Sequence, residues 1–261
     1  MLSASETRTQ TAIKVENVSL TYKAPLERRP TLKGRLSRKE AGFRLIEAVK
    51  NVSFEVHKGT VMGVMGANGA GKSTLMRMIS GILPPQEGRI EVLGRVSTLL
   101  ALGVGFNRDL TGRENVVLGG LAAGLSREQM LAKYDEIVEF AELEDFMDVP
   151  MRAYSSGMYG RLGFAVAVTM EPDILVIDEA LSVGDARFRR KSFDKMRDLC
   201  TEERTIVIVS HSLGAIKDLA DEAIWLDKGD LKMCGQVDEV VDAYAEFLGV
   251  EQEDATSKED V

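Results

Sequence analysis

Nine consecutive residues, GANGAGKST at positions 66–74, have the types and the spacing to hold the phosphates of a nucleotide. They match the pattern G-x-x-x-x-G-K-[ST], in which glycines allow backbone amides to approach phosphate oxygens closely. The lysine supplies a positive charge to the outer phosphates, and the serine offers its hydroxyl to Mg²⁺. A chance glycine turn is the alternative, but a strand-like sequence precedes the loop and helical spacing follows it. The predicted phosphate contacts are Gly66, Ala67, Asn68, Gly69, Ala70, Gly71, Lys72, Ser73 and Thr74.

Two adjacent carboxylates end a second apolar run, EPDILVIDEAL. A strand made of this run delivers Asp178 to the edge of a sheet beside the phosphate loop, where it can hold Mg²⁺ through water. Glu179 then stands where a general base can polarise an attacking water. A strand followed by an ordinary polar turn is the alternative, and the phosphate loop upstream argues against it. We therefore expect Ser73 and Asp178 at the metal and Glu179 at the catalytic water.

Two further predicted elements end or begin in polar side chains. His211 ends the strand-like run RTIVIVSHS, and strand carboxyl ends face the ligand in an open α/β sheet, so this residue could contact the γ-phosphate. The other histidine, His57, lies at a hairpin-like edge and is expected to face solvent. Ser155, Ser156 and Gly157 open an apolar helix, and hydroxyls with free amides at a helix start can bind phosphate. An ordinary helix cap is the alternative for these three residues.

The order of these features resembles that of the nucleotide-binding subunits of ABC transporters, over about residues 12 to 248. The resemblance implies that Tyr22, in VENVSLTYK, stacks on the adenine of ATP. It also implies that Ser155 and Gly157 match the family's L-S-G-G-Q signature, with Ser156 between them, and touch the ATP bound to a second copy of the chain. Each site is then built from two chains, so an isolated monomer is expected to hydrolyse ATP poorly.

Three more residues take their implied roles from the same resemblance. Asp185, in LSVGD, matches the loop that communicates across the dimer, while Glu179 and His211 match the catalytic glutamate and the switch histidine. The sequence departs from the family where Ser156 replaces the first signature glycine and Met158 replaces the glutamine. No glutamine stands within ALGVGF, where the family's glutamine loop is expected, so the usual glutamine ligand of Mg²⁺ is missing.

Four short stretches, L-G-V-G-F, L-T-G-R-E-N, Y-S-S-G-M and S-V-G-D, resemble the polysaccharide-exporter branch of ABC transporters. That branch moves O-antigen, capsule, teichoic acid or galactan on lipid carriers. The resemblance implies a homodimer that uses ATP with Mg²⁺ and pairs with a multi-span membrane permease, expected in two copies. It also implies a lipid-linked glycan as substrate and a position on the cytoplasmic face of the plasma membrane.

The elements that must position these residues predict an α/β fold: a P-loop NTPase of the ABC-type ATPase class with a β-rich N-terminal subdomain and a helical subdomain. We expect a flexible N-terminus over 1–11, the ATPase domain over 12–249 and an acidic, disordered tail over 250–261. Within the domain, a basic insertion spans 23–44 and the helical subdomain spans about 107–165. The insertion carries eight Lys and Arg against two Glu, and is either a solvated loop or an element that faces membrane headgroups.

Local patterns fill in the helical subdomain and the C-terminal region. Thr111 with Glu114, and Ser126 with Gln129, form capping-box patterns at two helix starts. An apolar stripe follows the second box and predicts a buried helix face, made of Leu131, Tyr134, Ile137, Val138 and Ala141. After His211, a hairpin with its turn at residues 228–230 and a closing helix, VDEVVDAYAEFL, are expected.

Composition excludes several other classes of protein. The net charge of −8 argues against a nucleic-acid partner, because phosphate contacts need a basic surface. Two cysteines, Cys200 and Cys234, are too few for a disulfide framework and are expected to be reduced thiols. No run approaches the roughly 18 apolar residues of a spanning helix, and the N-terminus lacks the apolar region of a secretory signal.

Other functions remain open on the sequence alone. An ABC-type ATPase without transport, of the metal-cluster assembly or chromosome-associated kind, is one alternative, and an ABC transporter for another substrate is a second. The chain lacks the long heptads that chromosome ATPases need, and an assembly ATPase has no need of L-G-V-G-F or the basic insertion. A P-loop kinase or GTPase is a third alternative, against which the serine-glycine helix start and the strand ending at His211 argue.

Overall fold

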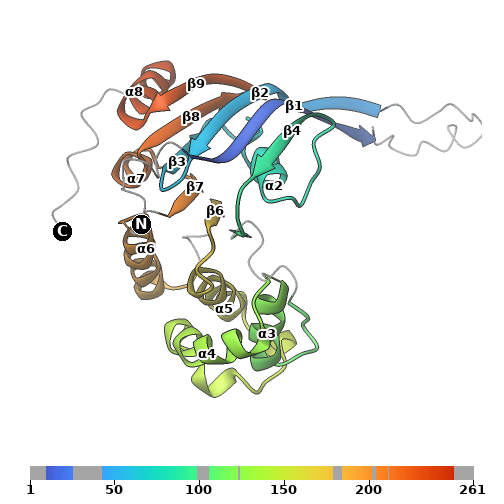
Figure 1. Ribbon diagram of the computed structural model, residues 1–261, viewed down its shortest axis with the longest axis vertical. Coiled ribbons are helices and arrows are strands. Elements are labelled where there is room, and N and C mark those ends of the chain that lie inside the picture. Colours follow the sequence, from blue (N-terminus) through green and yellow to red (C-terminus); the bar gives the residue numbers. More distant parts are fainter. Residues whose placement is uncertain are drawn as a thin grey trace, which may run out of the picture.

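The computed structural model describes residues 10–25, 43–98, 106–122, 124–178, 184–201, 204–210 and 212–249. Two sheets occupy the upper part of the view in Figure 1, and a group of helices lies below them. Most of the basic insertion, all of the acidic tail, Glu179, His211 and residues 99–105 of the glycine-rich stretch lie outside the described residues. The predicted α/β class is confirmed, with sheets and helices in the expected order.

The larger sheet has six strands in the order β5-β6-β7-β3-β8-β9. Its first five strands run parallel, and β9 pairs antiparallel with β8. All residues of β3 and β7 are buried, as expected for strands of a parallel sheet that is covered on both faces. The strands are β3 Val61–Met65, β5 Val96–Thr98, β6 Ile174–Asp178, β7 Thr205–Val209, β8 Glu222–Asp227 and β9 Asp230–Gln236.

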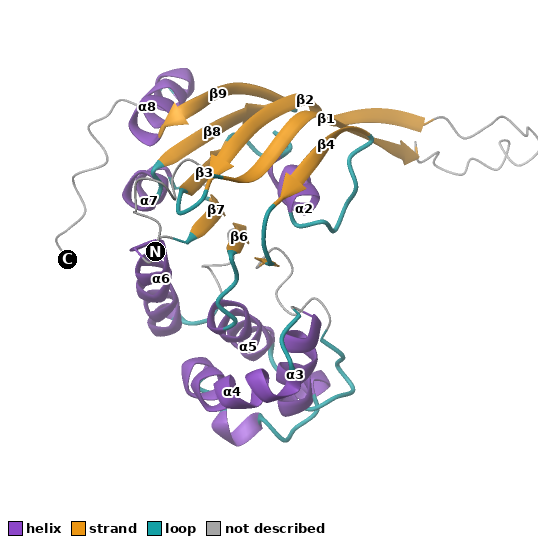
Figure 2. Cartoon of the chain, viewed as in Figure 1, coloured by secondary structure: helices purple, strands orange, loops and turns teal. Residues whose placement is uncertain are grey.

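The smaller sheet is antiparallel, with the strand order β2-β1-β4, and confirms the predicted β-rich N-terminal region. It contains β1 Thr11–Pro25, β2 Phe43–His57 and β4 Glu87–Val92. The first strand begins one residue before the expected start of the domain at position 12. Helix α2, Lys72–Ile79, shares one buried cluster with both sheets, which fixes the helix that follows the phosphate loop between them. Figure 2 shows α2 beneath β1 and β4.

The helices of the lower group in Figure 2 build a core of their own. They are α3 Gly112–Ala122, α4 Arg127–Ala141 and α5 Ser156–Thr169, with short 3₁₀ turns at Glu144–Phe146 and Met151–Ala153. Both capping boxes are confirmed: the Ser126 hydroxyl accepts from the Gln129 amide, and the Thr111 amide donates to the Glu114 carboxylate at 2.8 Å.

The predicted apolar stripe on α4 is confirmed except for its first member. Leu131 is 51% exposed, whereas Met130 is fully buried. The buried positions of α4 begin at Met130 and repeat at Tyr134, Ile137 and Ala141, spacings of four, three and four residues that keep one helix face turned to the core. Leu131 lies one residue off this line, on the side turned toward solvent.

The C-terminal region follows its predicted order. The hairpin turns at Lys228 and Gly229, both with positive φ, and α8, Val237–Leu248, closes it. Helices α6, Ala186–Thr201, and α7, Leu213–Leu219, pack into one apolar cluster with α8 and the larger sheet. In the part of the chain that the structure describes, no helix is long and apolar enough to cross a membrane.

Two expectations about single residues have opposite outcomes. Cys200 and Cys234 are free thiols, as predicted, and burial raises the pKa of the Cys200 thiol to about 11. The expectation that His57 faces solvent is wrong. Its ring is half-buried at the end of β2, and its Nδ1 atom is buried without a hydrogen-bond partner among the described residues.

Candidate functional site

The phosphate loop, residues 66–71, joins β3 to α2 and is shaped by backbone contacts. Gly66 has φ +143°, and a Cβ atom there would lie 2.1 Å from the Leu226 carbonyl oxygen. Gly71 has φ +106°, and its Cβ would lie 2.2 Å from the Ala48 oxygen. Both conformations and both close approaches require glycine. The shape of the loop is therefore restricted by close contacts with the backbone of β2 in one sheet and of β8 in the other.

Main-chain hydrogen bonds also connect the phosphate loop to the turn between β8 and β9. The Gly229 amide donates to the Ala70 oxygen at 3.0 Å, and the Lys50 amide donates to the Gly229 oxygen at 2.8 Å. The turn between β8 and β9 thus connects the phosphate loop to β2. Because these bonds use only main-chain atoms, the shape of the loop depends little on the side chains around it.

Lys72 lies across the loop that it follows. Its Nζ donates to the Gly66 oxygen at 2.7 Å and to the Ala67 oxygen at 3.1 Å, and the residue is 7% exposed. Burial lowers the pKa of this ammonium, while the negative charge of Asp178 acts in the opposite direction. Among the described residues, the hydrogen bonds of this buried cation go to neutral carbonyls, an arrangement that favours an anion in the loop as a countercharge.

Asp178 reaches the loop through the strand order. The Ser73 hydroxyl donates to its Oδ2 atom at 3.1 Å, although the two residues are 105 positions apart. In the larger sheet β6 and β3 lie on either side of β7, so the end of β6 comes beside the start of α2. This pair was predicted as the metal site, and the structure brings it together.

The chemistry of Ser73 and Asp178 fits Mg²⁺. Both offer oxygen atoms, and Mg²⁺ is commonly held by one or two protein carboxylates with substrate phosphates and water. Within the described ranges, no group of three or more His, Cys, Asp or Glu side chains could hold a metal by itself. Phosphate oxygens of a nucleotide and water are the ligands that could complete the coordination of such an ion.

A hollow of about 360 Å³ lies over the loop, within the size range of small-molecule sites. Tyr22 and Ile46, paired across β1 and β2, form one wall, and Asp178 lies at the other end. The Tyr22 ring is 37% exposed, and its hydroxyl lies 3.4 Å from the Thr74 Oγ1 atom. An exposed ring at the rim offers a stacking face to a planar base whose phosphates reach the loop.

A second hollow, of about 710 Å³, lies at the start of α5. The Ser155 Oγ atom caps this helix and accepts from the Met158 amide at 3.1 Å. Ser156, Gly157 and Asp185 line the same hollow, which shares no lining residue with the first. A Cβ added at Gly157 would meet only the Ser155 hydroxyl, at 3.8 Å, so the helix start is open to an approaching group.

The predicted site residues therefore form two separate groups on one chain. Tyr22, the phosphate loop and Asp178 meet at the first hollow, while the serine-glycine helix start and Asp185 meet at the second. Glu179 and His211 lie outside the described residues, one position after Asp178 and two after the end of β7. Within one chain these two groups therefore line separate hollows.

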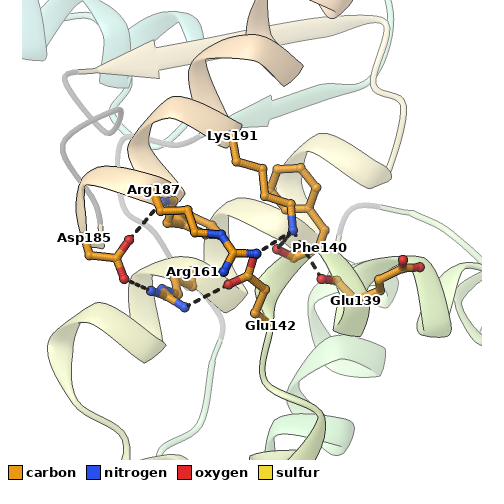
Figure 3. Close-up of polar contacts among 8 residues, drawn as sticks. Glu139, Phe140, Glu142, Arg161, Asp185, Arg187 and Lys191 are labelled. Atoms are coloured by element: carbon orange, nitrogen blue, oxygen red, sulfur yellow. Dashed lines mark hydrogen bonds and ion pairs between the residues drawn. The ribbon is translucent and has the colours of Figure 1, made fainter.

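The sequence did not predict a role for two charged residues that line the second hollow, Glu142 and Arg161. Arg161 of α5 forms an ion pair with Asp185, and Glu142, just after α4, lies on its other side (Figure 3). The sequence carried one signal for Arg161: it lies six positions after Ser155, on the same predicted helix. No local pattern marked Glu142, because its partners come from helices far along the chain.

Comparison with known proteins agrees with this geometry. Residues 49–182 match the family described as ABC transporter. The chain is 44% identical over 230 residues to the O-antigen export system ATP-binding protein RfbB of Myxococcus xanthus, covering 88% of this chain and 52% of that protein. It is 43% identical over 236 residues to the teichoic acids export ATP-binding protein TagH of Bacillus anthracis, covering 90% and 43%. The chain thus spans about half the length of these relatives.

A solved structure has the same fold. The dimeric, post-hydrolysis state of an ATP-binding cassette bound to ADP and Pi superposes with a TM-score of 0.68 at 23% identity, over 86% of this chain and 98% of that one. The agreement covers both the sheets and the helical group, since nearly all of the other chain is included.

Proposed function

This chain belongs to the ABC transporter family, and from that premise we propose that it is the ATP-hydrolysing subunit of an exporter of a lipid-linked polysaccharide. One observation carries the proposal of an ATPase: a complete phosphate loop with Asp178 hydrogen-bonded to its Ser73 at 3.1 Å. The cargo is supported by two relatives whose names state O-antigen and teichoic acid export. Those names favour an exporter over an assembly ATPase or a P-loop kinase.

In this proposal the first hollow binds ATP. The loop amides and Lys72 hold the phosphates, and Tyr22 stacks on the adenine. Ser73 and Asp178 would hold Mg²⁺, which would supply positive charge beside the phosphates. Support comes from the buried ammonium of Lys72, whose hydrogen bonds within the described part of the chain go to the Gly66 and Ala67 carbonyl oxygens of the loop.

Glu179 is the proposed general base for the attacking water, and His211 the proposed contact with the γ-phosphate. Support comes from the strands that precede them. β6 ends at Asp178, one residue before Glu179, and β7 ends at Val209, two residues before His211. Both strands run parallel to β3, so their carboxyl ends lie on the side of the sheet from which the phosphate loop leaves.

The second hollow then meets the ATP of another copy. Ser155, Ser156 and Gly157 present a helix start to the γ-phosphate, and Asp185 carries the communication between the two sites. Two chains in a head-to-tail arrangement complete two sites. Each dimer is proposed to pair with two copies of a multi-span permease at the cytoplasmic face of the plasma membrane. Within the domain at 12–249, we propose that the basic insertion, 23–44, faces the membrane headgroups.

A trapped dimer tests the ATPase proposal. Glu179→Gln removes the base but not the nucleotide contacts, so ATP with Mg²⁺ should convert the monomer to a stable dimer. Light scattering during size-exclusion chromatography measures the conversion. Lys72→Ala is the control, since it should prevent dimer formation by removing a phosphate contact. A Glu179→Gln protein that stays monomeric at saturating ATP would contradict the proposal.

The cargo needs a separate measurement on the full complex. The subunit should be reconstituted with its permease in liposomes, and its ATPase rate compared with a lipid-linked glycan and with the same lipid diphosphate without glycan. We expect the glycan-bearing lipid to raise the rate. If neither lipid changed a rate that depends on the permease, the substrate would belong to another class.

A further inference from the structure

Glu142 has a backbone conformation that is unusual for its type. It follows the last residue of α4 and has φ 56° and ψ 49°, in the left-handed region. Glycine is the common residue at such helix ends, because it adopts this conformation without a Cβ contact. Contacts of the side chain must hold a glutamate in this conformation.

The Glu142 carboxylate lies among three cations from two other helices (Figure 3). Its Oε1 atom is 3.1 Å from the Lys191 Nζ atom and 3.7 Å from an Arg187 nitrogen, both on α6. Its Oε2 atom is 3.7 Å from Arg161 on α5. One side chain at the end of α4 therefore connects α4 to α5 and to α6, the helix that follows Asp185.

Arg161 continues this connection to the second hollow. Its guanidinium pairs with Asp185 on one side and with Glu142 on the other, and it lies over the Phe188 ring. Asp185 in turn accepts from the Phe188 amide at 2.9 Å and so fixes the start of α6. The helix that carries Ser155 is thereby tied through one arginine to both neighbouring segments.

An apolar contact backs these charges and does not depend on them. Phe140, Phe164 and Phe188, from α4, α5 and α6, pack with ring centroids 5.8 to 6.1 Å apart. Lys191 also donates to the Phe140 carbonyl at 3.0 Å, at the end of α4. Loss of the carboxylate should therefore leave the three helices packed while it removes the ionic restraint on their relative orientation.

We propose that Glu142 is a positioning residue, which sets the serine-glycine start of α5 and Asp185 at the orientation that the second copy requires. This proposal rests on the proposed function, in which that helix start contacts the partner's ATP. Glu142 lies in the second hollow but acts through Arg161, Arg187 and Lys191, and it lines no part of the first hollow. Its removal should therefore slow hydrolysis in the dimer without weakening ATP binding to the monomer.

The chain offers a matched control at Glu171. This glutamate also follows a helix, α5, and has φ 47°. Its carboxylate pairs with Lys133 at 2.9 Å, at the end of α5 opposite Ser155. Glu142→Gly and Glu171→Gly therefore remove the same charge and relieve the same backbone conformation, and they differ in which end of α5 they affect.

The test measures kcat, KM and monomer affinity for a fluorescent ATP analogue in both variants, with the melting temperature of each. Glu142→Gly should lower kcat by about tenfold, because small misplacements of catalytic groups have effects of this size or larger. Its monomer affinity and melting temperature should match or exceed those of the wild type. Glu171→Gly should keep kcat within about twofold of wild type.

Two further variants separate charge from shape. Glu142→Gln keeps the length of the side chain and should lose activity like Glu142→Gly, whereas Glu142→Asp keeps the charge and should recover part of it. An unchanged kcat in Glu142→Gly would overturn the proposal, and so would equal losses in the two glycine variants or a loss that follows the melting temperature. Failure of the proposed function is distinct, because the Glu179→Gln protein with Glu142 intact would then form no ATP-dependent dimer.

Discussion

The two hollows of this chain are held in different ways. The phosphate loop is fixed by main-chain contacts with β2, β8 and the turn after β8, and its helix is buried between two sheets. The start of α5 is joined to the end of α4 and to α6 by ion pairs between side chains, in addition to the apolar packing of these helices. The first half of the proposed site is therefore held by main-chain contacts, whereas the orientation of the second half also depends on ion pairs between side chains.

The difference suits a site made from two copies. A nucleotide can bind first to a preformed loop, because main-chain bonds and glycine conformations need no rearrangement. The helix start must then meet that nucleotide from another chain, and ion pairs at a partly exposed joint permit small changes of angle. Four measurements would test this contrast between the two hollows.

Gly71→Ala should have the largest effect. The added Cβ would lie 2.2 Å from the Ala48 oxygen at φ +106°, and backbone atoms cannot move aside as a side-chain end can. We expect ATP affinity to fall by roughly a thousandfold, about 4 kcal/mol, in titration calorimetry. Gly81→Ala is the control, with φ +69° but nothing within 4 Å of its Cβ. Equal losses in both variants would mean that backbone conformation, not contact, shapes the loop.

Ser155→Ala should act on the other half of the site. It removes a hydroxyl from the helix start proposed to face the partner's ATP, and we expect kcat to fall by about a hundredfold with monomer affinity unchanged. Ser126→Ala is matched, since each serine caps a helix by accepting from an amide, at 3.1 Å and 3.2 Å. Both should lose about 1 kcal/mol of stability. If kcat fell by a similar factor in Ser126→Ala, loss of a helix cap would explain the effect, and Ser155 would have no further role at the proposed site.

Glu142→Gly, with an expected tenfold fall of kcat, tests directly whether ion pairs set the orientation of the α5 start. If the serine end of α5 were as rigid as the phosphate loop, removal of one carboxylate would leave kcat unchanged. A double-mutant cycle of Glu142→Gln with Lys191→Met measures how much of the effect passes through that pair. Additive losses would assign the restraint to Arg161 or Arg187 instead.

The pH dependence of ATP binding should show the smallest effect. Burial lowers the pKa of Lys72, so the apo protein loses this charge at a pH below 10.5, the ordinary value for lysine. ATP affinity should therefore weaken on the alkaline side before an ordinary lysine titrates. Over the same window the unfolded chain binds more protons than the apo protein, so the contribution of Lys72 to apo stability increases as pH rises. Lys72→Arg, which stays charged, should not show the dependence.

Most of the first hollow could be predicted from the sequence. The phosphate loop is nine contiguous residues whose glycines and lysine have one common use together, and the strand before it and the helix after it are local patterns. Asp178 could be predicted because it ends an apolar strand in a chain that already has such a loop. Its hydrogen bond with Ser73 could not, since it depends on β6 and β3 lying on either side of β7.

Less of the second hollow could be predicted. The start of α5 could be predicted from Ser155 and the apolar helix after it. The burial of Leu131 was predicted wrongly, because Met130 and Leu131 are adjacent apolar residues and only the packing around α4 decides which of them is buried. Glu142 had no local signal at all, since its three cations lie 19 to 49 positions away along the chain. Long-range pairs of this kind arise from packing, not from spacing.

By itself, then, the amino-acid sequence determined the phosphate loop, the order of strands and helices and most of the helix caps, because each depends on neighbours within a few residues. Only the tertiary structure decided which parts meet: that Asp178 reaches Ser73, that the two hollows share no residue, and that Glu142 joins three helices. The physical reason is the range of the interaction. Backbone conformation and capping act within a turn or a loop, whereas sheet order and ion pairs between helices depend on the closure of the whole chain.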